Sequence, residues 1–405
     1  MDTLMNILQD SGQFNTELQA QYSEHVLTTY ARYPVAFVRG HGCRLVDVEG
    51  KEYIDFTSGI GVCSIGHAHP YWVAAIATQA GMLAHTSNLY YTVPGLKLAK
   101  RLCALSGMGG AFFSNSGAEA NEGLIKVARK HSLMKYGEGR STILTLEGSF
   151  HGRTITTLAA TGQEKFHQNF GPFTEGFRHV PPGDTAALEA QGDDVCALMI
   201  EAVQGEGGVV PLDEAYVQKA AEICRKRGWL LLVDEVQTGI GRTGHWFGFQ
   251  SFKNIKPDAI SFAKGIASGL PLGGFLVSEE LKNVLSPGDH ATTYGGNLIC
   301  CAAAVATLDI LDSVLPQVSE KGEYITKKIK AMNLPKIVEI RGKGLMLGIK
   351  VKDIAPGDIN LKLLEAGLAS LTAGTDVIRF LPPLTISTAD IDAGLEIFEK
   401  VMKEI

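Results

Sequence analysis

Lys264 and Asp234 are the residues of this chain whose types and positions most strongly indicate chemistry. Lys264 follows the apolar segment 259–263 and stands directly before a glycine. Asp234 follows a second apolar segment, 229–233. Because burial disfavours the charged form of a lysine, such a residue readily forms imines, and an aspartate near it can pair with a pyridinium nitrogen. The two residues therefore suit pyridoxal phosphate (PLP), which a lysine holds as a Schiff base.

Both residues also have other interpretations. A carboxylate at the end of a buried strand needs a partner, and a metal ion shared with His67 and His69 would provide one. No residue at metal-ligand spacing accompanies Asp234, so we predict no metal site and interpret both histidines as turn residues between Gly66 and Pro70. The lysine could instead extend to water or bind a phosphate, but the chain contains no Walker pattern.

The segment Ser114–Glu122 follows a predicted strand and opens a predicted helix. A serine–glycine turn at a helix N-terminus offers a phosphate free N–H groups, a hydroxyl and the positive end of the helix dipole. Ser116 and Glu119 also form the pattern of a capping box, which by itself is the commoner interpretation. Only the other motifs of the chain favour a phosphate site here.

The segment Ser149–Thr154 follows the predicted strand 142–146, at the edge where an open α/β sheet binds its ligands. Phe150 can stack on a flat heteroaromatic ring, and Arg153 can bind a carboxylate through two hydrogen bonds. A core phenylalanine and a surface arginine explain the same residues about as well. This segment alone does not decide between the two interpretations.

Two further loops carry weaker signals. Gln204–Gly208 follows an apolar strand and contains three glycines, which permit close approach of the backbone. No dinucleotide-binding fingerprint occurs in the chain. Thr292–Asn297 is a polar loop directly before a predicted helix, and its hydroxyls could contact a phosphate.

The composition narrows the class of protein. The chain has 405 residues, of which 45% are hydrophobic and 20% charged, and this predicts a globular protein with a large core. Its net charge of −6 offers no polyanion-binding surface, so we expect no nucleic-acid partner. The seven cysteines include no Cys-x-x-Cys pair, which is typical of reduced thiols in a cytoplasmic protein.

The sequence also predicts no association with a membrane. Segment 1–15 lacks the basic start and long apolar core of a signal peptide. No apolar stretch approaches the ~20 residues that a membrane-spanning helix needs. Both observations agree with a cytoplasmic location.

From about residue 70 the pattern predicts helices that alternate with short apolar strands. Such strands are typical of a mostly parallel sheet that is covered on both faces. The predicted strands are 111–114, 142–146, 195–200, 229–233, 259–262 and 274–277. We expect one large α/β domain, which we place at residues 61–305.

The two ends of the chain have another character. A helix is predicted within the first ~25 residues, and segment 36–56 alternates in hydrophobicity, which predicts a small antiparallel meander. Beyond a predicted helix at 298–311, the C-terminal part reads as a mixed α/β unit with strands at 343–350 and 376–381. Its last helix is capped by Thr388 in our prediction. We expect segments 1–60 and 306–405 to pack together as a smaller domain.

Taken together, the motifs resemble those of the class III aminotransferases of PLP fold type I. The resemblance runs over nearly the whole chain, and seven motifs in order are far more specific than any one of them. They are Ser116–Glu119, Phe150–Arg153, Gln204–Gly208, Asp234–Gln237, Lys264, Thr293–Asn297 and Arg379–Pro383. Within the family, the chain is most similar to the acetylornithine aminotransferases. This likeness rests on Gly66–Pro70, His85–Tyr90, Ala160–Lys165, Glu175–Arg178 and Gly342–Gly348.

The resemblance implies both a fold and a reaction. The fold is α/β, with a mostly parallel central sheet in a large domain and a small α/β domain built from both termini. The reaction transfers the side-chain amine of N-acetylornithine, or of a close ornithine derivative, to 2-oxoglutarate, giving a semialdehyde and glutamate in arginine metabolism. The cofactor is pyridoxal 5'-phosphate, and the protein is a homodimer.

The family pattern also assigns roles at the cofactor. Lys264 would hold the cofactor and move the proton, and Asp234 would keep the pyridine nitrogen protonated. Phe150 would stack on the ring, and Gln237 would reach the ring hydroxyl. The phosphate would be bound by Ser116, Gly117, Ala118 and Thr293 of the partner subunit.

Three further residues are assigned to the substrates. Arg153 and Arg379 would bind substrate carboxylates. Glu206 would cover Arg379 while a basic donor occupies the site. An arginine that can be covered or exposed would let one site accept two differently charged substrates.

Two loops depart from the family pattern. Cys63 stands where an asparagine is common, and Leu298–Cys300 replaces the usual Pro-Leu after the Gly-Gly-Asn. Both loops are expected near the substrate or the dimer interface, so they bear on substrate identity. Ornithine, succinylornithine or 4-aminobutyrate aminotransferase activity therefore stays open, and so does a PLP aminomutase or racemase.

Overall fold

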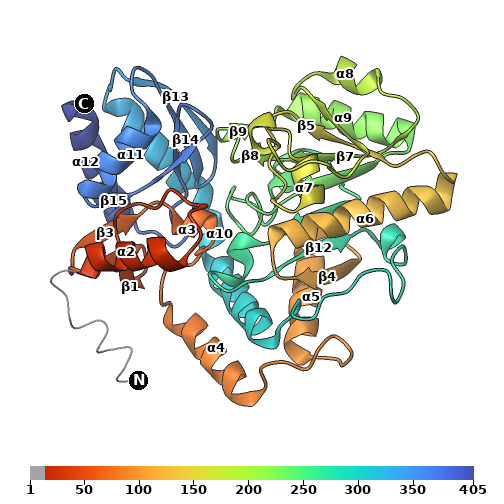
Figure 1. Ribbon diagram of the computed structural model, residues 1–405, viewed down its shortest axis with the longest axis horizontal. Helices are drawn as coiled ribbons and strands as arrows, with labels where there is room; N and C mark the ends of the chain where they lie inside the picture. The colour runs from red at the N-terminus through yellow and green to blue at the C-terminus, as the bar shows by residue number, and fades with distance from the viewer. Residues whose placement is uncertain (1–13) are drawn as a thin grey trace.

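The computed structural model describes residues 14–405. A seven-stranded sheet forms the centre of its larger domain (Figure 1). All strands of this sheet run in one direction except β12, which is antiparallel to both neighbours. The strand order is β4 (Gly110–Ser114), β12 (Gly273–Val277), β11 (Ala259–Phe262), β10 (Leu230–Asp234), β7 (Val195–Glu201), β5 (Thr142–Leu146) and β6 (Phe177–Val180). The predicted mostly parallel sheet is confirmed.

The strands form where the sequence is apolar without interruption. Every residue of β5, β7, β10, β11 and β12 is buried, as expected for a sheet covered on both faces. Each of the six predicted strands agrees with the observed one within one residue at either end. The sequence does not predict the edge strand β6, because Arg178 and His179 interrupt its apolar pattern.

Helices pack against this sheet, and their ends follow from local chemistry. The helix α6 packs on β12 and β11, while α9 and α5 pack on β10 and β4. Asp213 caps α9 by accepting a hydrogen bond from the N–H of Tyr216, and Gly228 ends it in a left-handed conformation. The helices of this domain are α4 (Pro70–Met82), α5 (Val93–Ser106), α6 (Gly117–Tyr136), α7 (Ile155–Ala160), α8 (Thr185–Glu189) and α9 (Glu214–Arg227).

The small domain joins the two ends of the chain (Figure 1). The predicted meander is observed as β1 (Phe37–His41), β2 (Arg44–Asp47) and β3 (Glu52–Asp55). The C-terminal strand β15 (Leu368–Ala369) pairs in parallel with β3. A small domain built from both termini is therefore confirmed, while the boundaries at residues 60 and 305 stay predictions.

A second sheet of the small domain is antiparallel throughout. Its order is β13 (Ile337–Lys343), β14 (Met346–Val351), β17 (Val377–Phe380) and β16 (Leu371–Ala373). The helices beside these sheets are α2 (Phe14–His25), α3 (Ser58–Gly61), α11 (Pro356–Glu365) and α12 (Thr388–Glu404). The predicted strand 343–350 is wrong in detail, because Gly344 and Leu345 form the turn between β13 and β14. The predicted cap of α12 is also wrong by one residue: Ser387, not Thr388, accepts the N–H of Asp390.

The helix α10 (Leu298–Ala331) is much longer than the predicted segment 298–311 and continues through Pro316. By length and composition alone it could cross a membrane, which corrects the expectation that no apolar stretch approaches that length. Asp309 and Asp312 interrupt the apolar residues of α10, so the sequence does not show the full length of the apolar stretch. Half of its apolar window is buried in the protein, and it packs against α4, α5 and α12, as a core helix does.

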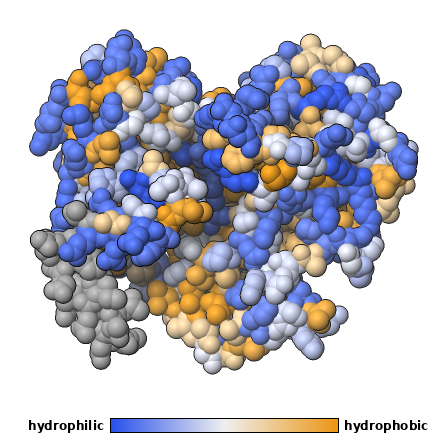
Figure 2. All heavy atoms as spheres, in the orientation of Figure 1, coloured by the Kyte–Doolittle hydropathy of each residue, from blue (hydrophilic) through white to orange (hydrophobic). Residues whose placement is uncertain are grey.

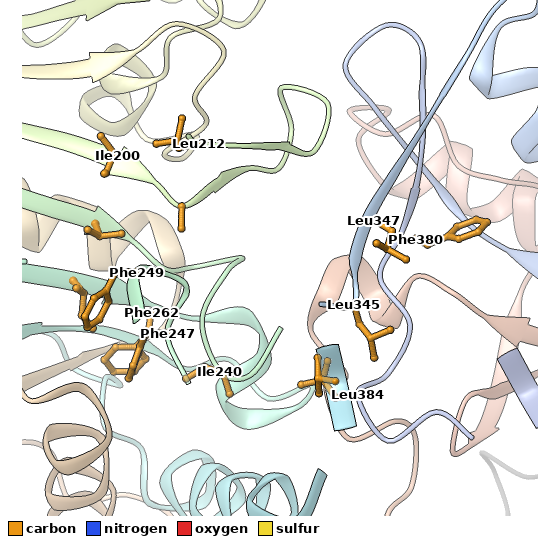
Figure 3. Packing of buried hydrophobic residues seen from close by; sticks show 14 of the residues in the cluster. Ile200, Leu212, Ile240, Phe247, Phe249, Phe262, Leu345, Leu347, Phe380 and Leu384 are labelled. Atoms are coloured by element: carbon orange, nitrogen blue, oxygen red, sulfur yellow. The ribbon is translucent and has the colours of Figure 1, made fainter. Parts of the chain in front are cut away.

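One large hydrophobic cluster extends through both domains. In Figure 3, phenylalanines 247, 249 and 262 lie on the side of the large domain, and Leu345, Leu347 and Phe380 lie on the side of the small domain. Ile240 and Leu384 lie between the two groups. The two domains therefore share a packed core below the site.

The prediction about a signal peptide falls largely on residues 1–13, outside the described range.

Candidate active site

A cavity of about 620 Å³ lies at the carboxyl ends of the central strands. Its walls come from the segments that directly follow β4, β5, β7, β10 and β11. Nine of the eleven predicted site residues line it: Ser116, Gly117, Ala118, Phe150, Arg153, Glu206, Asp234, Gln237 and Lys264. Arg379 contacts two of these residues, and only Thr293 stands apart.

A larger cavity, of about 720 Å³, lies between α2 and the small domain. Among residues 14–405, Arg32 is the only charged residue that lines it. It therefore lacks the paired acids and bases that chemistry needs, and we assign the active site to the smaller cavity.

Asp234 is buried at the end of β10 and is fully engaged as an acceptor. Its Oδ2 accepts hydrogen bonds from Asn121 Nδ2 at 2.7 Å and His151 Nδ1 at 2.8 Å. Its Oδ1 accepts from the N–H of Val236 at 2.9 Å and from Ser261 Oγ at 3.2 Å. Burial opposes the charge, but the hydrogen bond and charge of His151 and the other donors hold the pKa of Asp234 below its ordinary value. The cavity thus contains a fixed, ionised carboxylate.

Lys264 begins the 3₁₀ turn η3 (Lys264–Ala267) that follows β11. Its φ of 41° is a left-handed conformation that a residue with a side chain rarely adopts. Burial lowers the pKa of its amine below the ordinary value, and the charge of Glu206 partly opposes this shift. No residue of the described chain gives Nζ a hydrogen bond or a salt bridge. A buried and unpaired amine whose pKa is lowered is suited to act as a nucleophile and as a base.

The first turn of α6 lies at the cavity, where the capping role of Ser116 is observed and the phosphate role stays a prediction. Ser116 caps the helix, because its Oγ accepts the N–H of Glu119 at 3.2 Å. The N–H groups of Gly117 and Ala118 have no partner within residues 14–405, as expected at a helix start. A Cβ at Gly117 would lie 2.7 Å from Val236 Cγ1, so only glycine fits beside the strand end that carries the aspartate.

Phe150 and Arg153 form the opposite wall. The guanidinium of Arg153 lies 4.2 Å from the ring centre of Phe166 and 5.3 Å from that of Phe150. No carboxylate of the described residues lies within 4.0 Å of it. Arg153 is therefore a cation at the cavity that is held by aromatic rings and has no anion of its own.

Arg379 is the opposite case, since it is buried and already paired. Its Nη1 donates to Glu206 Oε1 at 2.5 Å and to Gln237 Oε1 at 3.2 Å. Its Nη2 lies 3.4 Å from Glu206 Oε2. Burial raises the pKa of Glu206, but the charge of Arg379 outweighs this effect and holds the pKa below its ordinary value. The predicted cover of Arg379 by Glu206 is therefore the arrangement in this structure.

Thr293 is exposed and does not line the cavity of its own chain. The neighbouring Thr292 Oγ1 accepts a hydrogen bond from Asn115 Nδ2 at 3.2 Å. The assignment of Thr293 to the phosphate therefore requires a second subunit and stays a prediction.

Comparison with known proteins agrees with this geometry. The family model described as Aminotransferase class-III matches residues 27–402. The acetylornithine aminotransferase of Haemophilus ducreyi is 47% identical over 393 residues, which cover 96% of this chain and 98% of the relative. The chain belongs to the class-III aminotransferases.

Solved structures of other aminotransferases share the whole fold of this class-III aminotransferase. An ornithine aminotransferase from Toxoplasma gondii, described as having PLP at partial occupancy in its active site, matches with a TM-score of 0.93 at 30% identity and covers 100% of this chain and 97% of its own. The acetylornithine aminotransferase of Elizabethkingia anophelis matches with a TM-score of 0.86 at 30% identity and covers 96% and 99%. The family and these neighbours imply PLP as the cofactor.

The residues of this class-III aminotransferase fit PLP. Lys264 has no competing partner for its amine. Asp234 presents an ionised carboxylate that is already oriented by four donors. Two free N–H groups at the start of α6 suit a phosphate. The buried Oδ1 of Asn121 also lacks a partner in the described chain and lines the same cavity.

No cluster in residues 14–405 offers three or more His, Cys, Asp or Glu side chains to a metal ion. His69 stands at the N-cap position of α4 without a side-chain hydrogen bond to the helix, and His67 Nε2 lies 2.8 Å from the buried Asp55 Oδ2. Both histidines lie in the short connection before α4, although His67 forms a β-bridge with Gly42 rather than a turn. The hydrogen bond that His67 donates to Asp55 raises the pKa of this imidazole to about 10, so it is charged near neutral pH and is a poor metal ligand.

The sequence interpretation gave no role to the residues that hold Asp234 in place. Asn121 and His151 stand inside motifs that the sequence had marked, but nothing in the sequence shows that they converge on one carboxylate. Glu201, at the end of β7, is a third omission: burial raises the pKa of its carboxyl to about 7. It accepts the N–H of Phe150 at 3.1 Å and so helps to fix that wall.

The departure at Leu298–Cys300 lies in the first turn of α10. Asn297 caps this helix by accepting the N–H groups of Ile299 and Cys300. Leu298 and Cys300 are buried in the core. None of these residues lines the cavity, so the replacement alters packing next to the site. Cys63 is half-buried, with its Sγ near Gly269, which does line the cavity.

Proposed function

We propose that this protein transfers the side-chain amine of N-acetylornithine, or of a close ornithine derivative, to 2-oxoglutarate in arginine metabolism. One observation carries the proposal: the cavity with the buried amine is lined by an uncovered arginine, Arg153, and by Glu206, which covers a second arginine, Arg379. The 47% identity to an acetylornithine aminotransferase over nearly the full length supports this donor. The absence of paired anions at Arg153 supports a carboxylate substrate.

Lys264 performs the proton transfer in this proposal. PLP, when bound, supplies the electron sink and carries the amino group between the two substrates. The Nζ of Lys264 removes the proton from the substrate carbon that bears the amine and later returns a proton. The lowered pKa of this amine, caused by its burial, favours its basic form.

Asp234 stabilises positive charge at the cofactor's ring nitrogen. Its four donors keep the carboxylate ionised and prevent its rotation. An ionised carboxylate favours a protonated ring nitrogen, and this preference matters most when electrons move into the ring. Asp234 therefore acts on the rate of the proton step more than on the binding of substrate.

The two arginines address the different charges of the two substrates. The donor presents one carboxylate, which Arg153 can bind, while the Glu206–Arg379 pair leaves the opposite end of the site without a free charge. 2-Oxoglutarate presents a second carboxylate, which Arg379 can bind once Glu206 has moved away. Because charged hydrogen bonds contribute ~1.5–3 kcal/mol each, exchanging one carboxylate for another at Arg379 is affordable in free energy.

An exposed apolar surface supports a homodimer. Apolar side chains of α4, α5 and their connection face solvent, and Figure 2 shows hydrophobic surface over α4. They include Tyr71, Met82, Leu89, Tyr90, Val93 and Leu96. Monomers rarely expose such a concentration of apolar groups. Asn88 of this connection donates to the carbonyls of Thr292 and Gly295, so a second copy on this surface would also lie close to Thr293.

Steady-state kinetics with four donors tests the proposed function. We expect kcat/KM with 2-oxoglutarate to be highest for N-acetylornithine, followed by succinylornithine, ornithine and 4-aminobutyrate. A preference for ornithine would instead favour the activity of the structural neighbour from Toxoplasma gondii. Turnover without 2-oxoglutarate would indicate an aminomutase or a racemase and would contradict the proposal. Light scattering tests the dimer.

A further inference from the structure

The loop that carries Glu206 is held by contacts from outside as well as by its own hydrogen bonds. Residues 205–209, here called the Glu206 loop, join β8 (Val203–Gln204) to β9 (Val210–Pro211). Three of its five residues are glycines, and Val209 has a φ of 56°, a left-handed conformation that is strained for a β-branched residue. Within the loop, the N–H groups of Gly208 and Val209 donate to the carbonyl of Gly205 at 3.4 and 3.2 Å, and contacts from outside the loop add to these two bonds.

Three neighbouring strands of the small domain provide those contacts. In the antiparallel register, Arg341 of β13 stands opposite Gly348 of β14, and Gly348 stands opposite Arg379 of β17. Directly opposite residues of antiparallel strands project from the same face of a sheet. The two arginines therefore flank a position that has no side chain.

The Glu206 loop lies on that empty position. A Cβ at Gly348 would be 2.8 Å from Val209 Cβ and 3.3 Å from the carbonyl oxygen of Gly208. On one side, Arg341 donates to this carbonyl from both Nε, at 3.0 Å, and Nη2, at 2.8 Å. The half-buried guanidinium thus holds the loop backbone two residues from Glu206.

The other contacts of the loop act on Glu206 itself. The N–H of Gly374 donates to the carbonyl of Glu206 at 3.0 Å. Arg379 donates to its carboxylate at 2.5 Å. Gln237 of the large domain also donates to this carboxylate, at 3.4 Å. Arg341, Gly374 and Arg379 belong to the small domain, so this domain provides the shorter contacts to both the backbone and the side chain of the loop.

We propose that Arg341 is a positioning residue for substrate selection: by holding Gly208, it keeps Glu206 where its carboxylate covers Arg379. This inference rests on the proposed function, in which Arg379 binds a carboxylate of the acceptor. Without the two bonds from Arg341, the Glu206 loop leaves Arg379 more often, and the uncovered state gains population. The acceptor then binds more readily, and the donor binds less readily.

The test substitutes Arg341→Met, which keeps the apolar stem and removes the donors. The two half-reactions are measured separately on the holoenzyme. We expect the ratio of kcat/KM for 2-oxoglutarate to that for N-acetylornithine to rise ~5–10-fold, since part of one charged pair is lost. The change falls mainly on KM.

Matched variants separate this role from a general loss of structure. Glu339→Gln removes the negative charge that Arg341 Nη1 contacts at 2.9 Å but leaves both bonds to Gly208, so the ratio stays unchanged. Gly348→Ala displaces the loop by another route and shifts the ratio in the same direction. If Arg341→Met does not fold, Arg341→Lys and Gly348→Ala decide the question.

A double-mutant cycle identifies the route of the effect. In a Glu206→Gln background, Arg341→Met leaves the ratio as it is, because no carboxylate remains to be positioned. An equal loss in both half-reactions, or a shift that persists in the Glu206→Gln background, overturns the proposal. If the wild type uses another donor, the proposed function fails, and Arg341 is judged by the same ratio with that donor.

Discussion

Asp234 and Glu206 are carboxylates at the same cavity, but the protein holds them in different ways. All four donors to Asp234 come from the large domain. Glu206 also belongs to the large domain, yet its contacts come from both domains: from Arg379 and Gly374 of the small domain and, at 3.4 Å, from Gln237 of the large one. The part of the site that performs chemistry is therefore built within one domain, and the part that selects substrates is assembled between two.

The comparison separates two requirements of a two-substrate enzyme. A carboxylate with four donors has no reason to change partner, so Asp234 acts identically on both substrates. A carboxylate with one main partner can exchange it for a carboxylate of the substrate. Substitutions in the fixed part should lower both half-reactions equally, and substitutions in the adjustable part should change their ratio.

Lys264→Ala gives the largest expected effect. Without its amine, the cavity has no base for the substrate carbon and no nucleophile, so kcat/KM of both half-reactions should fall by about 10⁴-fold or more. The measurement is single-turnover kinetics of each half-reaction. Because burial of the charged amine costs stability, the apo variant should melt no lower than the apo wild type. Loss in only one half-reaction would contradict the comparison.

Asp234→Asn should lower both half-reactions by a common factor on the order of 10²–10³. The amide keeps the size of the side chain but loses the charge that favours a protonated ring nitrogen. The ratio of kcat/KM for 2-oxoglutarate to that for the donor is the informative quantity, and it should stay within about twofold of the wild type. A change in this ratio would mean that Asp234 also selects substrates.

Glu206→Gln should change the ratio instead. An amide covers Arg379 without neutralising it, so 2-oxoglutarate should gain over the donor by about 10–100-fold, the equivalent of one charged hydrogen bond. The measurement is the same pair of half-reactions, with the proton step itself unaffected. An unchanged ratio of kcat/KM for 2-oxoglutarate to that for the donor would contradict the assignment of Glu206 to the adjustable part.

Glu235→Gln gives the smallest expected effect, and it tests the stability of the fixed part, since Glu235 stands next to Asp234. Burial raises the pKa of this carboxyl to about 7, although Thr238 and the N–H groups of Gly248 and Phe249 donate to it. The folded state therefore keeps a proton that the unfolded state loses near pH 4.5, so this residue's contribution to stability falls as pH rises from ~4.5 to ~7. Glu235→Gln should flatten this dependence of Tm, by roughly a few degrees; a parallel pH profile would contradict it.

Much of the fold follows from local patterns in the sequence. The strands of the central sheet are continuous apolar runs, and the cap residues of α9 mark its ends. The errors have physical causes. The sequence stops α10 early because Asp309, Asp312 and Pro316 look like a boundary, whereas burial of the flanking turns keeps the helix intact.

The sequence predicted the site residues that stand in local motifs, but it did not predict which residues contact them. Residues that project from strand ends, such as Lys264 and Asp234, were found because topology places all such ends at one edge. Asn121 and His151, two of the four donors to Asp234, come from α6 and from the segment after β5. No local sequence pattern shows that they contact the same carboxylate. The row of Arg341, Gly348 and Arg379 likewise depends on strand register.

The pairing of Glu206 with Arg379 also has a consequence for apparent affinity. In the proposed function, Glu206 is a tethered ligand that competes with the acceptor at a local concentration set by the chain, at least on the order of millimolar. The measured KM for 2-oxoglutarate then contains the fraction of time during which Arg379 is uncovered: if that fraction is about one tenth, the apparent affinity is about tenfold weaker than the intrinsic one. The enzyme would thus carry its own competitive inhibitor. Any change in the small domain that loosens Glu206 would lower the measured KM for 2-oxoglutarate.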